Sequence, residues 1–123
     1  MREPVRDVER LRHVLETIDT IEKSRIIHTS GEAASDPIVY YGFVKHVEII
    51  GEAVYMLSKE FKEAHPEVEW APIEGMRHVL VHGYYHIRPQ QLWDTIDYDL
   101  PELKPIIERF FHELTDSGND AVK

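Results

Sequence analysis

The feature that most constrains the fold is a long apolar stripe in the middle of the chain. Its residues are spaced alternately by three and four, so a helix places them all along one face. The stripe consists of Tyr40, Phe43, Val47, Ile50, Val54, Leu57 and Phe61. Asp36 and Pro37 supply a cap and a first-turn proline, which predicts a helix over residues 37–64. Gly51 in its middle costs about 1 kcal/mol relative to alanine, and we expect it to admit another helix at close range.

Shorter stripes of the same kind predict the remaining elements. We expect a long first helix over residues 4–28, a small polar loop over 29–35, a third helix from Pro72 to about residues 83–86, a short fourth helix from Arg88 to about Asp97, a last helix from Pro101, and a frayed polar tail over 115–123. Trp70 and Trp93 are expected to be packing residues. The predicted fold is therefore all-α: a single domain over residues 1–123, forming an antiparallel bundle of about five helices, with a hairpin of two long helices and three shorter ones.

Composition and charge exclude several classes of protein. The chain has 123 residues and no cysteine, so it has no disulfide framework and no thiol chemistry. It contains no run of 18 apolar residues and no apolar leader, and we expect a cytoplasmic protein without a membrane span. The net charge of −9 argues against generic nucleic-acid binding, which relies on a basic surface. Any RNA binding must therefore use a locally positive strip.

Such a strip lies between Arg77 and Trp93, where the sequence has no acidic residue. It begins with Arg77, whose guanidinium suits a phosphate, and contains His78, His82 and His86, which can move protons near neutral pH. On a regular helix Arg77 and His82 lie roughly 140° apart. We therefore expect either a distortion near Gly83 or a second copy of the helix, supplied by a two-fold dimer, to complete a shared site.

The residues of this strip alone leave three interpretations open. In the first, histidine transfers protons and arginine stabilises a phosphate during metal-free cleavage of RNA, whose 2′-hydroxyl is the nucleophile. In the second, a neighbouring histidine pair, His78–His82 or His82–His86, binds a metal, since Glu74 and these histidines recur at intervals of four. In the third, the histidines are surface or interface residues without chemistry.

A family resemblance covers roughly residues 40 to 110. Arg77, His82 and Tyr84 resemble the R-x-x-x-x-H-x-Y signature of HEPN domains, and specifically of the HepT-like toxins. Flanking segments are similar in order and spacing: Ile50-Gly51-Glu52-Ala53, Leu57-Ser58, His65-Pro66-Glu67-Val68-Glu69-Trp70, Ile73-Glu74-Gly75-Met76, Leu92-Trp93 and Leu100-Pro101-x-Leu103. Where this group often has asparagine after the arginine, the chain has His78.

The resemblance implies a helical, homodimeric, metal-independent endoribonuclease toxin without a cofactor. Arg77 and His82 of two subunits would form the catalytic site across the dimer interface, with His78 in a supporting role. The partner would be an MntA-type nucleotidyltransferase antitoxin that transfers AMP to Tyr84 and so silences the nuclease. Added phosphate would put negative charge where the RNA phosphate must lie.

Two alternatives to this function follow from the same residues. The chain could be a non-catalytic helical partner that docks a nucleotidyltransferase and presents Tyr84 for modification. It could also be a metal-binding bundle that uses one of the two histidine pairs. Activity in the presence of a chelator separates the nuclease from both alternatives.

Overall fold

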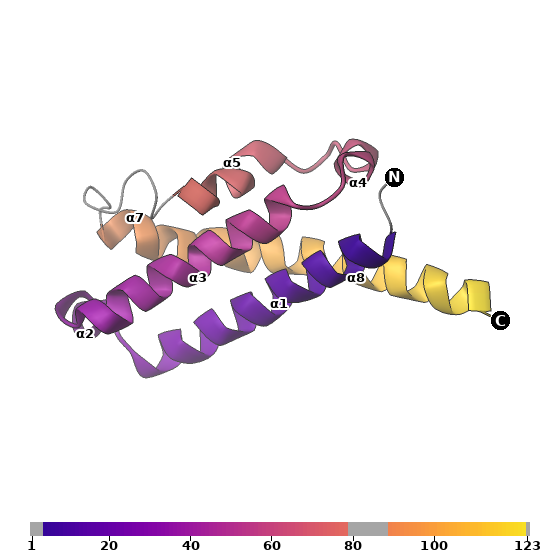
Figure 1. Cartoon of the computed structure of the whole chain (residues 1–123). Coiled ribbons are helices and arrows are strands. Elements are labelled where there is room, and N and C mark those ends of the chain that lie inside the picture. Colours follow the sequence, from indigo (N-terminus) through magenta and orange to yellow (C-terminus); the bar gives the residue numbers. More distant parts are fainter. Residues whose placement is uncertain (1–3, 79–88, 123) are drawn as a thin grey trace.

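The computed structural model describes residues 4–78 and 89–122, with side chains for 6–78 and 89–116, and these residues are almost entirely helical (Figure 1). The elements are α1 (Pro4–Ile27), α2 (Ser30–Ser35), α3 (Pro37–Tyr55), α4 (Lys59–Ala64), α5 (Trp70–Glu74), the 3₁₀ turn η1 (Gly75–His78), α7 (Pro89–Asp94), the π-helical turn η3 (Thr95–Asp99) and α8 (Leu100–Val122). No strand occurs within these ranges, so the all-α prediction is confirmed. No helix among the described residues is long and apolar enough to cross a bilayer.

Three long helices enclose the core. α1 and α3 form the predicted antiparallel hairpin, and α8 packs along α1 (Figure 1). All seven residues of the apolar stripe are buried. They meet buried side chains of α1 and α8, including Leu11, Val14, Ile18, Leu100, Ile107 and Phe110. We predicted two long helices, and α8 is a third. It has 23 residues and continues past Thr115, where we expected a frayed tail.

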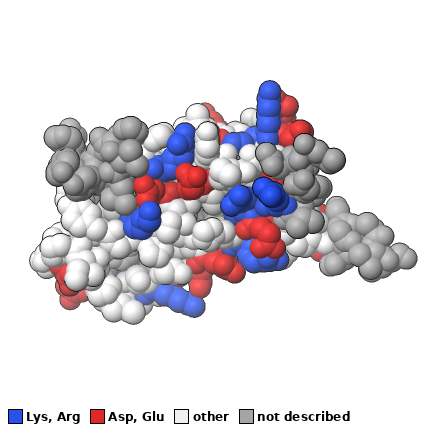
Figure 2. All heavy atoms as spheres, viewed as in Figure 1, with Lys and Arg blue, Asp and Glu red and all other residues white. Residues whose placement is uncertain are grey.

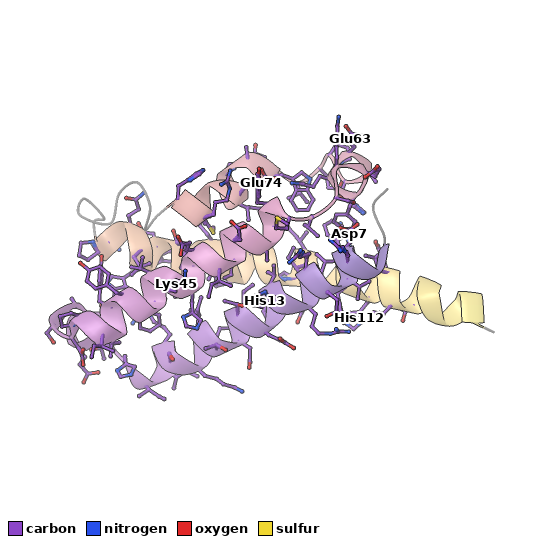
Figure 3. The ribbon with its side chains drawn as sticks, viewed as in Figure 1. Asp7, His13, Lys45, Glu63, Glu74 and His112 are labelled. Atoms are coloured by element: carbon purple, nitrogen blue, oxygen red, sulfur yellow. The ribbon has the colours of Figure 1, made fainter. Side chains whose placement is uncertain are left out.

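The helix predicted over residues 37–64 is wrong in one respect, because it breaks between Tyr55 and Lys59. The buried carboxylate of Asp7 binds the chain at this break. It accepts hydrogen bonds from the Ser58 backbone N–H at 2.8 Å and from the Ser58 hydroxyl at 2.7 Å. The same hydroxyl accepts from the N–H of Phe61 and so caps α4. Figure 3 places Asp7 at the start of α1, so this contact fixes the far end of α3 against the first helix.

Other boundaries also differ from the prediction. The expected loop over residues 29–35 is a short helix, because Thr29 and Glu32 form a reciprocal capping box. The predicted cap at Asp36 is confirmed by hydrogen bonds from Ile38 and Val39. The third helix begins at Trp70, two residues before Pro72, and its predicted end lies outside the described residues. Leu100 continues the π-helical turn directly, so the last helix does not restart at Pro101.

Both tryptophans pack as predicted, and each one joins distant elements. The Trp70 indole N–H donates to the carbonyl oxygens of Lys62 and His65. Trp93 is buried beneath the guanidinium of Arg25, which lies 4.7 Å from its ring centroid. Arg25 also donates to both carboxylate oxygens of Asp97, and this hydrogen bonding raises the pKa of Arg25. The end of α1 is thereby held to α7 and η3.

The Asp7–Ser58 contact generates a stability prediction. Asp7→Ala leaves the buried N–H and hydroxyl of Ser58 without an acceptor, and we expect it to lower the free energy of unfolding by about 2–3 kcal/mol. Glu16→Ala, which removes an exposed carboxylate from the same helix, should change it by less than about 0.5 kcal/mol. Urea unfolding followed by circular dichroism measures both. Equal losses in the two variants would show that this contact does not fasten the helices.

Candidate functional site

The structure describes part of the predicted site. Arg77 and His78 lie in η1, where the helix has tightened into a 3₁₀ turn, and both are partly buried. His82, Tyr84 and His86 lie outside the described residues. The relation between Arg77 and His82, and the expected distortion near Gly83, therefore stay predictions. Arg77 itself contacts α3 through both its backbone and its side chain.

Gly51 lets the backbone of η1 lie directly on α3. A Cβ atom added at Gly51 would come within 2.8 Å of the carbonyl carbon and the Cβ of Met76, and would collide with the backbone nitrogen of Arg77. Any side chain at position 51 would therefore push η1 away from α3. The expectation that Gly51 admits another helix at close range is confirmed, and the segment it admits is the one that carries Arg77.

Tyr55 holds the side chain of Arg77 from the same face of α3, one helical turn after Gly51. The guanidinium carbon of Arg77 lies 3.8 Å from the centroid of the Tyr55 ring, which is the geometry of a cation–π contact. The Nε atom of Arg77 is buried and has no hydrogen-bond partner within the described part of the chain. Buried donors normally have an acceptor, and none of the described residues supplies one for this N–H.

Lys62 and Glu74 form the next contact outward from this stack. The Lys62 ammonium donates to the Glu74 carboxylate at 2.6 Å and to the carbonyl oxygen of Tyr55 at 3.2 Å. It also lies 5.7 Å from the Tyr55 ring centroid. Figure 3 shows Glu74 on α5, so the ion pair joins α4 to α5 above the end of α3. Lys62 is thus held close to Arg77 but its charge is paired.

Glu74 belongs to the stripe that suggested a metal site, and its carboxylate is engaged by Lys62. Among the described residues no group of three or more histidine, cysteine, aspartate or glutamate side chains is arranged to hold a metal ion. Both candidate histidine pairs include His82, which lies outside those residues. The metal interpretation therefore stays untested at the pairs themselves.

Two hollows flank the segment that carries Arg77, and their charges differ. One has a volume of about 610 Å³ and is lined in part by Tyr55, Met56, Lys59, Lys62 and Trp70. The other, of about 790 Å³, lies between α5–η1 and α7–η3–α8. Its described lining includes Glu67, Glu69, Asp99 and Glu102 and no lysine or arginine, so it disfavours an RNA phosphate.

The surface charges of the described residues fit a local site rather than a broad basic face. In Figure 2 the lysine and arginine side chains are interspersed with aspartate and glutamate. Ion pairs among the described residues include Lys45–Glu48 and Lys59–Glu63. A polyanion would therefore meet little net attraction on this face, as the net charge of −9 led us to expect.

Sequence reasoning did not find Tyr55 or Lys62. Tyr55 lies off the apolar stripe and has no motif spacing to Arg77, and 21 residues separate the two in sequence. The signal that was available is Gly51, since a residue one turn further along a helix faces the same neighbour. Lys62 carried no signal, because its pairing with Glu74 depends on the break between α3 and α4.

A model of one protein family matches most of the chain. The sequence model of the family described as "Ribonuclease HepT-like" matches residues 7–110. This range contains Gly51, Tyr55, Lys62 and Arg77, and it includes most of the three long helices. No solved structure gives a significant match to the chain.

Several named proteins are similar over most of the chain. "Putative RNase TTE0752" of Caldanaerobacter subterraneus subsp. tengcongensis is 36% identical over 104 residues, which are 84% of this chain and 92% of that protein. "Probable ribonuclease HepT" of Thermococcus cleftensis is 31% identical over 80% of this chain and 90% of its own length. "Putative RNase MJ1216" of Methanocaldococcus jannaschii is 30% identical over 97% and 99%, respectively.

The Gly51 contact can be tested against a second glycine of the same helix. Gly51→Ala forces η1 off α3, and we expect it to lower the free energy of unfolding by about 1–3 kcal/mol, as overpacking does. Gly42→Ala is the matched control, because a Cβ at Gly42 meets no atom within 4 Å. That variant should stabilise the protein by up to about 1 kcal/mol through helix propensity. Thermal unfolding distinguishes the two, and stabilisation by both would refute the close contact.

Proposed function

The chain belongs to the HepT-like ribonuclease family, and on this basis we propose that it is a metal-independent endoribonuclease toxin in which Arg77 binds the scissile phosphate and His82 transfers protons. The observation that carries this proposal is the setting of Arg77. Gly51 and Tyr55 fix its backbone and side chain, and its buried Nε–H has no acceptor among the described residues. An arginine held in this way can bind an anion without first losing side-chain freedom.

The proposed reaction uses the nucleophile that RNA itself supplies. The 2′-oxygen bonds to phosphorus and the bond from phosphorus to the 5′-oxygen breaks, which leaves a 2′,3′-cyclic phosphate and a free 5′-hydroxyl. One proton leaves the 2′-hydroxyl and one joins the departing 5′-oxygen, and histidine is suited to both transfers near neutral pH. Arg77 stabilises the additional negative charge on the phosphate oxygens.

A homodimer would complete this site. On a regular helix Arg77 and His82 lie roughly 140° apart, so a second copy of the segment supplies the missing group if the two face each other. Each subunit then contributes one Arg77 and one His82. His78 is adjacent to Arg77 and partly buried, which is consistent with a supporting role in the same site.

Regulation by a partner is the second part of the proposal. An MntA-type nucleotidyltransferase antitoxin would transfer AMP to Tyr84 and inactivate the toxin, with both proteins in the cytoplasm. Tyr84 is two residues from His82. A phosphodiester and a nucleoside there would add negative charge and bulk beside the bound phosphate.

Cleavage in the presence of a chelator tests the catalytic proposal. Purified protein in excess EDTA should cut a structured RNA, and Arg77→Ala and His82→Ala should each lower the rate by at least about 100-fold, the range for one acid–base or charge-stabilising group. His13→Ala is the control, because His13 is an exposed histidine on α1 (Figure 3), and it should keep full activity. Gel analysis of the products and their 2′,3′-cyclic ends measures the outcome.

The alternatives give different results in the same experiment. Activity that EDTA removes and a divalent metal restores would favour a histidine-pair metal site. If neither the wild-type protein nor any variant cuts the RNA, intact mass spectrometry decides whether Tyr84 already carries AMP. An unmodified and inactive protein would refute the nuclease and favour the non-catalytic partner of a nucleotidyltransferase.

A further inference from the structure

The hollow beside Arg77 presents aromatic and apolar surface to solvent. Its walls include the ring of Tyr55 and the side chain of Met56, which are 44% and 41% exposed. Trp70 also lines it, and its indole N–H is already bonded to two backbone carbonyls. The tryptophan therefore offers the hollow only the face or edge of its ring. Exposed aromatic rings of this kind are surfaces on which single-stranded bases stack.

The charges around the hollow cancel in pairs. Lys62 is bonded to Glu74 at 2.6 Å, and Lys59 lies 3.9 Å from Glu63. All four residues line the hollow, so its described lining is close to neutral. Such a lining attracts a phosphate weakly but accepts a flat, uncharged ring. A phosphate is attracted instead to the charged guanidinium of Arg77, which lies on the ring of Tyr55.

Tyr55 connects the two environments. One side of its ring is covered by the guanidinium of Arg77 at 3.8 Å. The ring also lines the hollow, whereas Arg77 does not. A phosphate on Arg77 and a base in the hollow would therefore both lie beside the same tyrosine.

We propose that this hollow is a nucleobase subsite, in which the base next to the phosphate bound by Arg77 packs on Tyr55 and Trp70. The proposal rests on the proposed function for its ligand, single-stranded RNA. It adds a role for α3 and α4, which the catalytic motif does not include. The subsite would hold the RNA strand in one direction across Arg77 and would favour cleavage where a base is unpaired.

Binding to an RNA analogue that cannot be cleaved tests the subsite directly. A 2′-O-methyl oligonucleotide lacks the free 2′-hydroxyl, and a matched oligonucleotide carries abasic residues in place of its bases. Fluorescence anisotropy gives Kd for each with wild-type protein, Tyr55→Phe and Tyr55→Leu. Tyr98→Leu is the matched control, because Tyr98 is an exposed tyrosine in η3, outside the lining of the hollow.

If the hollow is a base subsite, binding of the oligonucleotide should depend on the aromatic ring of Tyr55 and not on its hydroxyl. Tyr55→Leu should weaken binding of the base-containing oligonucleotide by about 5- to 150-fold, the equivalent of one base–aromatic stack. Tyr55→Phe and Tyr98→Leu should stay within about twofold of wild type. Wild type should bind the abasic oligonucleotide more weakly by a similar factor. Tyr55→Leu, which also removes the contact with Arg77, should weaken binding of the abasic oligonucleotide clearly less than binding of the base-containing one.

Three results would overturn the subsite. Tyr55→Leu could weaken both oligonucleotides equally, which would mean that Tyr55 only positions Arg77. Wild type could bind both oligonucleotides equally well, a comparison that needs no variant to fold. Finally, the wild-type protein could fail to bind either oligonucleotide. Cleavage of unmodified RNA, measured in parallel, separates the two proposals: cleavage without base-dependent binding removes the subsite alone, and base-dependent binding without cleavage removes the nuclease alone.

Discussion

The approach of η1 to Gly51 is the contact on which the candidate site depends. A side chain at this position would meet the backbone of Met76 and Arg77, so the absence of a Cβ lets the segment that carries Arg77 lie directly on α3. α3 is in turn held by α1 through the apolar core and by the Asp7–Ser58 hydrogen bonds at its end. Because η1 contacts α3 through backbone atoms, the long helices hold the backbone of Arg77 more accurately than a contact through a flexible side chain could.

Electrostatics explain how an acidic chain can have an RNA substrate. The net charge is −9, and many described lysines and arginines are paired with carboxylates. Arg77 is different, because its Nε–H is buried and lacks an acceptor among the described residues. In the proposed function, phosphate recognition is concentrated at one arginine per subunit. Binding then depends less on long-range attraction than on stacking and on the second subunit.

The sequence predicted what periodicity and local chemistry determine. The heptad stripe predicted α3 and its buried face, Asp36 and Pro37 predicted its start, and Gly51 predicted a close contact. The break at Met56–Ser58 was not predicted, and the acceptor that binds Ser58 there, Asp7, is 51 residues away. The stack of Arg77 on Tyr55 likewise joins two residues that are far apart in the sequence. The capping box formed by Thr29 and Glu32 could have been recognised in the sequence. It was missed because a six-residue helix has too short an apolar stripe to identify.

The most direct test of the account is the environment of the Arg77 Nε–H with and without an RNA analogue. Its ¹⁵N–¹H resonance can be assigned with Arg77→Lys and followed by NMR as a 2′-O-methyl oligonucleotide is added. If Arg77 binds the phosphate, this resonance should move downfield on binding, as a charge-assisted hydrogen bond forms, while that of Arg25, which already donates to Asp97, should stay in place. An unchanged Arg77 resonance at saturating oligonucleotide would contradict the assignment of Arg77 as the phosphate ligand.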